Sequence, residues 1–370
     1  MKIVCSKQNL FNGLLIVSRA IPSKPSLSIL DCILVDTTKG NITLTGNNID
    51  MGIETVVEGD IIEPGIVALD AKMIVEIVRK LPDSEVTIET GKDYKTTIVC
   101  EKAKFNIMGK SGDEYTYLPK VEKESSIVLS QYALKEIVRK TIFSVGENDN
   151  NILMRGELFK INGTTLTVIA LDGHRVAIRN IELKEAFGDR EIIILGKSLN
   201  EVMKIISDDT EKEITISFTQ KHVVFEFDET VVVSRIIEGE FFKVSKMISS
   251  DYETKMIINK RELMDCIERA MLLVKEGDKK PIIFNITDTK VEIMISSSIG
   301  SMKEDIDIEK QGKDLMIGFN AKFVLDALRV IEDETVEFFM VNPKSPCFIK
   351  KEGEESYTYL VLPVNFSMVN

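Results

Sequence analysis

The strongest candidate for acid–base chemistry is the run Leu171-Asp172-Gly173-His174-Arg175-Val176-Ala177, which contains one of only two histidines. An Asp, a His and an Arg so close together could support general acid–base catalysis. However, Asp172 and His174 are only two residues apart, and no Gly-x-Ser-x-Gly nucleophile pattern accompanies them. A tight Asp-Gly turn that shapes a groove is the better interpretation. An α+β enzyme that uses Asp172, His174 and Arg175 is kept as an alternative.

Other motifs that could carry chemistry fail on spacing. Gly109-Lys110-Ser111 and Gly196-Lys197-Ser198 resemble the end of a phosphate-binding loop, but the required earlier glycines are replaced by Lys104 and Glu191. His222 lies in an alternating, strand-like run and is interpreted as structural. The sequence therefore predicts no metal, no cofactor and no catalysis. The scattered cysteines lack a Cys-x-x-Cys pair and are expected to be buried thiols: Cys5, Cys32, Cys100, Cys266 and Cys347.

The composition is that of an ordinary globular protein of two or three domains, with 370 residues, 44% of them apolar and 29% charged. The absence of Trp predicts an aliphatic core. No run approaches the roughly 20 apolar residues that span a bilayer, and the first residues do not resemble a signal peptide. We therefore expect a cytoplasmic protein without membrane contact. The net charge of −12 excludes a protein that is basic all round, but it does not exclude a local basic surface.

An internal repeat of about 125 residues organises the chain. Residues 69–81 match residues 319–331 position by position at an offset of 250, and residues 196–206 lie midway at an offset of 125. Apolar residues recur in all three segments at helical spacing, after a small or N-capping residue. Because the repeat is domain-sized, it predicts three similar domains over residues 1–124, 125–250 and 251–370. A gene triplication without functional meaning is the alternative.

Each repeat is expected to run strand, helix, several strands, helix, several strands. This predicts an α+β fold of three repeated domains, each with two helices packed on antiparallel sheets. The first helices are expected at residues 8–20, 131–142 and 260–273, and the second at the matched segments above. Strand-like alternation is found at residues 42–45, 85–89, 166–169, 213–217, 290–293 and 334–339.

Basic residues recur on the second helices at equivalent positions. Lys72, Lys197 and Lys322 correspond, and a second basic residue follows each at a spacing of seven, on the same helical face. A solvated face explains any single helix, but recurrence favours a common surface. If two chains place two helices from each of six repeats around a ring, a spacing of about 9 Å gives a circumference of roughly 110 Å. The hole is then on the order of 25 Å, which admits duplex DNA. A structural oligomer without a DNA role is the competing hypothesis.

Several segments together resemble one known family along the whole chain. They are Leu27-Ser28-Ile29-Leu30, Ile42-Thr43-Leu44-Thr45-Gly46, Asp172-Gly173-His174-Arg175, Ile317-Gly318-Phe319-Asn320 and Tyr359-Leu360-Val361-Leu362-Pro363-Val364. The chain resembles the beta subunit of bacterial DNA polymerase III, the sliding clamp. The resemblance implies a six-domain ring formed by a head-to-tail homodimer. It further implies a non-catalytic processivity factor that encircles duplex DNA and tethers the replicative polymerase.

The resemblance also implies a partner-peptide groove between the second and third domains. In this chain the groove would comprise Met154, Leu171, Gly173, His174, Arg175, Val176, Phe242, Lys246, Met247, Val361, Leu362, Pro363 and Val364. Family members often have Pro and Arg where this chain has Phe242 and Lys246. We expect the apolar residues to hold Leu or Phe side chains, His174 and Arg175 to frame the groove, and free backbone groups of the C-terminal strand to pair with the peptide. The alternative is that the apolar residues only seal a domain interface.

Two further sets of residues follow from the same resemblance. The DNA-facing candidates are Lys24, Lys72, Arg79, Asn148, Lys197, Lys204, Lys322 and Arg329. The dimer contact would join Phe105 and Ile107 of one chain to Leu272 and Leu273 of the other, unless the first two are ordinary strand core. The implied partners are duplex DNA bound without sequence preference, a second copy of the chain, the replicative polymerase subunit, the clamp loader and other proteins with a short clamp-binding peptide.

Overall fold

The computed structural model describes residues 1–24, 27–115, 118–119, 125–146, 149–248, 251–275 and 280–366. Its contacts divide the chain into two compact units, here called the first and second unit. The first unit combines Met1–Leu134 with Lys197–Ile236, and the second combines Lys135–Gly196 with Ile237–Asn370. Among the described residues, no helix is both long and apolar enough to cross a membrane.

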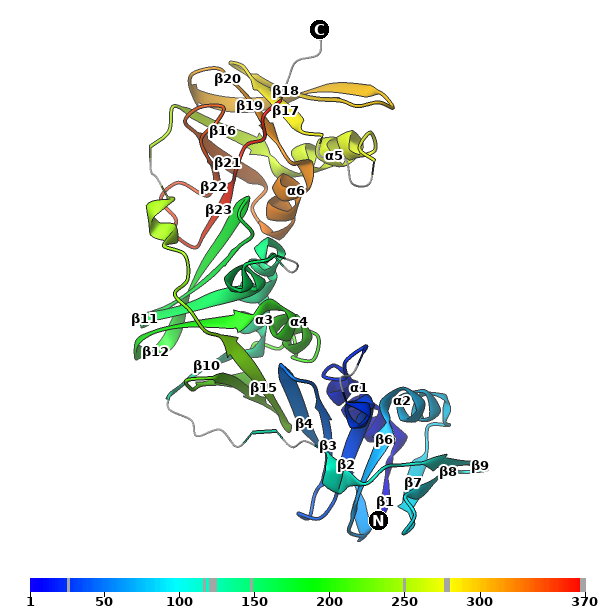
Figure 1. The fold of residues 1–370 in the computed structure, drawn as a ribbon. Helices are drawn as coiled ribbons and strands as arrows, with labels where there is room; N and C mark the ends of the chain where they lie inside the picture. The colour runs from blue at the N-terminus through cyan, green and yellow to red at the C-terminus, as the bar shows by residue number, and fades with distance from the viewer. Residues whose placement is uncertain are drawn as a thin grey trace. The chain divides into compact units, whose positions relative to one another are not determined.

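Helices form at each of the places where the repeat predicts them. The first helix of each repeat is α1 (Lys7–Ser18), α3 (Gln131–Arg139) and α5 (Lys260–Met271). The second helix is α2 (Ala71–Lys80), α4 (Gly196–Met203) and α6 (Ala321–Val330). Figure 1 shows α1 and α2 in the first unit and α5 and α6 in the second, each pair in contact. The predicted helices are therefore confirmed, although most end before the last apolar residue of the pattern.

Side-chain caps explain where these helices begin. Asp70 accepts a hydrogen bond from the backbone N–H of Met73 at 2.8 Å at the start of α2, and Asn320 accepts one from the N–H of Lys322 at 3.0 Å at the start of α6. The apolar stripe of α6, with Val324 and Leu328 among its members, is buried in the core of the third repeat. The basic residues between these apolar positions consequently face solvent.

Two antiparallel sheets build the first unit. One has the order β5-β1-β7-β8-β9, and Figure 1 shows β9 at its edge. Its strands are β1 (Lys2–Ser6), β5 (Asp60–Glu63), β7 (Glu85–Thr90), β8 (Lys95–Cys100) and β9 (Ala103–Met108). The other runs β6-β2-β3-β4-β15-β14-β13-β10 and crosses from the first repeat to the second where β4 pairs with β15. Its strands are β2 (Cys32–Asp36), β3 (Ile42–Asn47), β4 (Met51–Val57), β6 (Ile66–Asp70), β10 (Ser125–Ser130), β13 (Glu213–Phe218), β14 (His222–Phe227) and β15 (Thr230–Ile237).

In the second unit, as in the first, one antiparallel ladder joins two successive repeats. Its antiparallel ladder runs β11-β12-β23-β22-β21-β16-β19-β18-β17-β20, and β12 pairing with β23 joins the second repeat to the third. The strands are β11 (Gly156–Leu171), β12 (Arg175–Leu195), β16 (Thr254–Asn259), β17 (Ile282–Ile286), β18 (Lys290–Ser296), β19 (Ser301–Gly312), β20 (Leu315–Phe319), β21 (Thr335–Met340), β22 (Cys347–Ile349) and β23 (Tyr357–Val361).

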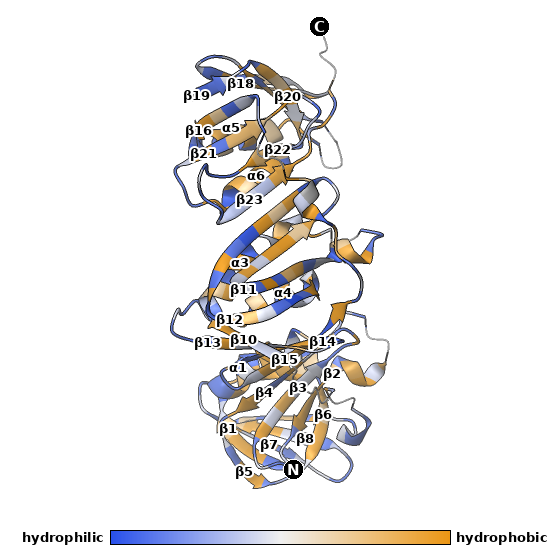
Figure 2. Cartoon of the chain, turned by 90° about the vertical axis from the view of Figure 1, so that its left-hand side faces the viewer, coloured by the Kyte–Doolittle hydropathy of each residue, from blue (hydrophilic) through white to orange (hydrophobic). Residues whose placement is uncertain are grey.

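The core is largely aliphatic, as the composition predicts, and Figure 2 shows apolar residues (orange) running through the strands. Aromatic side chains are also buried in several places, and the third repeat contains a group of three. Phe284 packs edge-on against Phe319 and also contacts Phe338, and all three side chains are fully buried in the third repeat. All five cysteines are buried free thiols. The fold is α+β, and in each repeat helices pack on antiparallel sheet, as the sequence predicts.

Candidate functional site

The run around His174 forms a tight hairpin between β11 and β12. The Asp172 side chain accepts hydrogen bonds from the backbone N–H groups of His174 (3.0 Å) and Arg175 (3.2 Å). Gly173, between Asp172 and His174, has φ +80°, a left-handed conformation that glycine adopts without steric cost. The predicted Asp-Gly turn is confirmed, and the first role of Asp172 is to build it.

Arg175 leaves this turn toward the core, not toward the edge of a groove. Its Nε donates to Asp172 Oδ2 at 2.9 Å, and its Nη1 donates to Asp326 Oδ2 on α6 at 2.7 Å. The guanidinium lies 4.5 Å from the centre of the Phe323 ring, and only 9% of the side chain is exposed. The expectation that Arg175 frames the groove is corrected, because the paired carboxylates draw its charge inward.

His174 stays exposed and stacks on Phe323, with ring centres 6.0 Å apart and planes inclined by 23°. Both oxygens of Asp172 are occupied, one by the turn and the other by Arg175. Asp172 therefore does not orient the imidazole as the acid of a catalytic pair would. Within the described part of the chain there is also no group of three or more His, Cys, Asp or Glu suited to a metal ion.

Beside this hairpin lies an apolar cluster that brings several predicted groove residues together. Leu171 and Val176 are buried in it, while Met154, Phe242 and Leu362 are half-buried at its surface. The chain continues from Phe242 to the exposed Met247 and Ile248, whose side chains are 47% and 41% accessible. The sequence prediction omitted some members of this cluster: Leu153, Phe241, Val244, Phe339 and Phe348. Two consecutive phenylalanines, Phe241 and Phe242, are the sequence feature that could have indicated some of these residues.

The C-terminal strand differs from the expectation. β23 pairs with β12 on one side and β22 on the other, so its backbone groups are not free to bind a peptide. Val361 is correspondingly buried. After the strand, the Leu362 N–H donates to the His174 carbonyl and the Val364 N–H to the Gly318 carbonyl, each at 2.8 Å. These bonds hold the half-buried segment around Pro363 against the hairpin and the third repeat.

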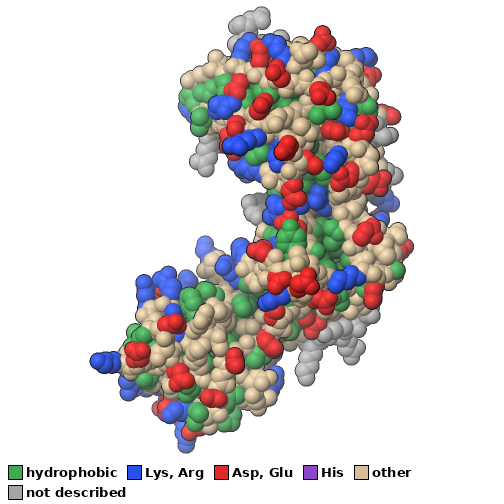
Figure 3. Space-filling view, turned by 180° about the vertical axis from the view of Figure 1, so that it is seen from behind, with side chains coloured by type: hydrophobic (Ala, Val, Ile, Leu, Met, Phe, Trp, Pro, Cys, Tyr) green, Lys and Arg blue, Asp and Glu red, His purple; other side chains and the backbone are tan. Residues whose placement is uncertain are grey.

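The basic candidates occupy equivalent exposed positions on the second helices. Lys72, Lys197 and Lys322 are each the second residue of a helix, and all three are exposed, as is Lys24. The later basic residues are exposed as well but form salt bridges: Arg79 with Glu76, Lys204 with Glu201 at 2.7 Å, and Arg329 with Glu268 at 2.9 Å. Figure 3 shows basic (blue) and acidic (red) side chains intermingled over the face that it presents. Asn148 and the side chain of Lys246 lie outside the described residues.

The candidate dimer residues lie on exposed edges. In the part of the chain that the structure describes, β9 pairs with β8 alone, and Phe105 on it is 38% exposed, so Phe105 is not ordinary strand core. Ile107 is half-buried. Leu272, just after α5, is 79% exposed, whereas Leu273 is half-buried against the core of the third repeat. Phe105 and Leu272 are therefore available at the surface for contact with another chain.

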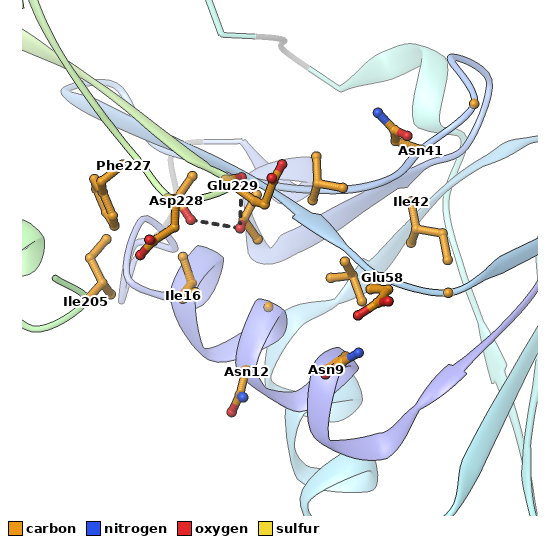
Figure 4. Close-up of a pocket in the computed structure, with 17 residues that line it drawn as sticks. Asn9, Asn12, Ile16, Asn41, Ile42, Glu58, Ile205, Phe227, Asp228 and Glu229 are labelled. Atoms are coloured by element: carbon orange, nitrogen blue, oxygen red, sulfur yellow. Dashed lines mark hydrogen bonds between the residues drawn. The ribbon is translucent and has the colours of Figure 1, made fainter. Parts of the chain in front are cut away.

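The first unit also contains a cavity of about 670 Å³ that involves none of the predicted site residues. Figure 4 shows Ile16 of α1 beside Asp228, which lies in the turn between β14 and β15, whereas Asn9 lies nearer to Glu58. Thr55 closes one side through a hydrogen bond to the Thr230 hydroxyl at 2.8 Å. The lining mixes amides, carboxylates and aliphatic groups without a nucleophile and base in contact, so it does not support a catalytic assignment.

Comparison with known proteins places the whole chain in one family. The N-terminal, central and C-terminal domain models of the DNA polymerase III beta subunit match residues 1–119, 128–243 and 245–365. A beta sliding clamp from Staphylococcus aureus is 33% identical over 94% of both chains. A chain from Eubacterium rectale, described as a DNA polymerase III beta subunit, is 58% identical with a TM-score of 0.96, covering 99% of this chain and 100% of that one. The DNA polymerase sliding clamp of Bacillus subtilis is 31% identical with a TM-score of 0.94 and the same coverage.

Proposed function

The chain belongs to the DNA polymerase III beta subunit family, and from this membership we propose that it works as a sliding clamp that holds the replicative polymerase on duplex DNA. It is a processivity factor and not an enzyme. The observation that carries the proposal is the match of three successive domain models to three repeats of one fold. Its site of action implies a cytoplasmic protein.

The active form in this proposal is a head-to-tail homodimer with six domains, three from each chain, divided at residues 1–124, 125–250 and 251–370. The position of β9 at an edge of its sheet supports it, because an edge strand with exposed apolar side chains is a template for another chain. Phe105 and Ile107 would meet Leu272 and Leu273 of the second copy. In the third repeat, residues 301–307 of β19 pair with β18 and offer a second strand for such contact.

Duplex DNA would pass through the ring and meet the second helices. Lys72, Lys197 and Lys322 support this role because each is exposed at the same helical position. Attraction between such residues and phosphates is independent of base sequence, so the ring can slide. The remaining candidates of this surface are Lys24, Arg79, Asn148, Lys204 and Arg329.

Partner proteins would bind the apolar surface beside the His174 hairpin. A peptide with Gln and Leu or Phe anchors would place its apolar side chains between Met154, Phe242 and Leu362, which are half-buried around one cluster. Leu171, Gly173, Val176, Val361, Pro363 and Val364 would shape this wall, and Lys246 and Met247 complete the proposed set. The polymerase subunit, the clamp loader and other peptide-bearing proteins would share it, and two grooves on one ring would permit exchange.

Retention on closed DNA tests the central proposal. The purified protein is loaded onto nicked circular DNA by a clamp loader, and the complex is then filtered before and after linearisation. We expect a mass of two chains by size exclusion, retention on the circle, and loss after the circle is cut. Equal retention on linear DNA, or a stable monomer, would favour the structural oligomer or another binding mode over a ring.

A further inference from the structure

The hairpin before β4 has the same construction as the His174 hairpin one repeat later. The Asn48 side chain accepts hydrogen bonds from the backbone N–H groups of Asp50 (2.8 Å) and Met51 (2.9 Å). Asp172 makes the same two bonds in the later hairpin, at a sequence offset of 172 − 48 = 124. The turn therefore belongs to the repeat and is not peculiar to the expected groove.

The bond that ties the neighbouring repeat to this hairpin is also duplicated. The Arg235 N–H donates to the Asp50 carbonyl at 2.9 Å, as the Leu362 N–H donates to the His174 carbonyl at 2.8 Å. A short 3-10 helix flanks each site: η1 (Ser28–Asp31) in the first repeat and η4 (Ile152–Arg155) in the second. The two sites thus share a backbone frame, but Arg235 stands where the other has Leu362.

A cavity of about 570 Å³ opens at this earlier frame, entirely within the first unit. Leu27 and Ile49 form an exposed apolar rim, with accessibilities of 58% and 64%, above the buried Leu30 and Met51. The Leu118 side chain closes one side by lying on Gly52, where an added Cβ would come within 1.8 Å of it. Such a hollow holds one or two apolar side chains of a partner.

The polar side of the cavity is formed by the basic Arg235, the acidic Asp50 and His222. Arg235 lies directly opposite His222 in the β14–β15 register, and both line the cavity with Asp50. Arg235 is exposed and forms no salt bridge within the described ranges. Burial lowers the pKa of His222, and the nearby charges of Arg235 and Lys221 lower it further. A carboxylate on a partner would complement the charge of Arg235.

We propose that this cavity is a second docking site for partner proteins, one that takes a peptide with an acidic residue beside Leu or Phe. It goes beyond the groove near His174, where Leu362 occupies the position of Arg235 and the chemistry is apolar. The same repeat unit would thereby present two sites of different selectivity on each chain. The acidic residue pairs with Arg235, and the apolar residue packs against Leu30, Ile49 and Met51.

Methyl NMR on the full-length protein, labelled at Met and Ile, separates the two sites. The probe is the peptide acetyl-Leu-Phe-Glu-Leu-Glu-amide, and its matched control is acetyl-Leu-Phe-Gln-Leu-Gln-amide. Ile49 and Met51 report on the cavity, and Met154 reports on the groove near His174. We expect the acidic peptide to shift Ile49 and Met51 saturably. Arg235→Glu should weaken that binding about fivefold or more, while Arg235→Lys stays within about twofold.

The outcomes are distinct. Unchanged Ile49 and Met51 signals at millimolar peptide, equal binding of both peptides, or equal binding by Arg235→Glu would overturn the proposal. A shift that depends on protein concentration without peptide would assign the cavity to a second copy and also overturn it. Deleting residues 363–370 should leave binding at Ile49 and Met51 intact, so failure of the groove near His174 is separable from failure here. Ile49→Ala, which keeps the charge, should weaken binding without changing the preference for the acidic peptide.

Discussion

The carboxylate of Asp326 lies 2.7 Å from the guanidinium of Arg175, across 151 residues of sequence. The equivalent acids in the earlier repeats, Glu76 and Glu201, each pair with the basic residue three positions later in the sequence. In the third repeat Asp326 pairs with Arg175, and Arg329 forms its salt bridge with Glu268 on α5. A helix with candidate DNA-facing residues is thereby joined directly to the hairpin of the candidate groove.

Asp326→Asn should destabilise the second unit by about 1–3 kcal/mol, because Arg175 is nearly buried and would lose a charged acceptor. Glu76→Gln is the matched control, since the Glu76–Arg79 pair is about half exposed and should change stability by less than about 1 kcal/mol. Urea unfolding of both variants measures the difference. Equal effects of the two substitutions would show that the Arg175–Asp326 pair contributes no more than a surface pair.

Because of Glu157, the free energy of unfolding should fall as the pH rises. Its side chain is fully buried, neither oxygen has a hydrogen-bond partner within the described residues, and burial raises its pKa to about 8 from 4.5. Since the unfolded state loses this proton first, the contribution is complete below pH 4.5 and is lost as the pH rises toward 8. Glu157→Gln removes the titration. The variant should therefore gain stability relative to the wild type between pH 5 and pH 8, by an amount on the order of a few kcal/mol.

Chemical denaturation at several pH values tests this prediction. Glu191→Gln is the control, because Glu191 is exposed and pairs with Lys160 on the protein surface. Its difference from the wild type should stay nearly constant over the same range. A constant difference for Glu157→Gln as well would mean that Glu157 is ionised or hydrated in the folded protein.

Leu272→Ala should weaken the proposed dimer while leaving the fold intact, because Leu272 is 79% exposed in the single chain. If the residue is fully buried in the dimer, the loss is about 2–5 kcal/mol of association free energy. Ile62→Ala is the control, since Ile62 is 58% exposed on β5, at the opposite edge of the sheet that ends in β9. Sedimentation measures both, and an unchanged dimer for Leu272→Ala combined with Leu273→Ala would reject this interface.

Charge reversal at Lys72 and Lys197 should shorten retention on circular DNA, and the difference from the wild type should shrink as the salt concentration rises, because salt weakens the phosphate attraction that these lysines supply. Both side chains are exposed on second helices. Lys92→Glu, in the exposed turn after β7, is the control for net charge. Retention is compared on circles of different sequence. A strong dependence on base sequence would be incompatible with contacts that are made only to phosphates.

Deleting residues 363–370 should abolish binding of a polymerase peptide but leave a folded dimer. The deletion removes the Val364 bond to Gly318 and frees Leu362 at the surface of the apolar cluster, while the paired strand β23 remains. Met154→Ala, which removes part of the same wall, should weaken binding without changing dimerisation. Peptide affinity is measured by fluorescence anisotropy. Full affinity in both variants would place the binding site elsewhere.

Local sequence patterns were sufficient to predict the helices, many of the strands and the threefold repeat. Helix caps such as Asp70 and Asn320, and apolar residues at helical spacing, act between residues close in the chain. The Asp172-Gly173 turn was predictable for the same reason, since both its hydrogen bonds span no more than three residues. The exposed positions of Lys72, Lys197 and Lys322 followed from helical periodicity once the repeat was aligned.

Tertiary structure alone decided which distant partners these residues meet. Nothing near Arg175 in sequence reveals that Asp326 will bind it, and nothing near Tyr357–Val361 reveals that strands on both sides will occupy its backbone. Glutamate is usually found at the protein surface, but Glu157 is buried because β11 turns its side chain into the interior. Periodicity determines which face of an element is apolar, whereas long-range packing determines what covers that face. Only this packing decides that Arg175 forms a buried ion pair and does not lie at the edge of a groove.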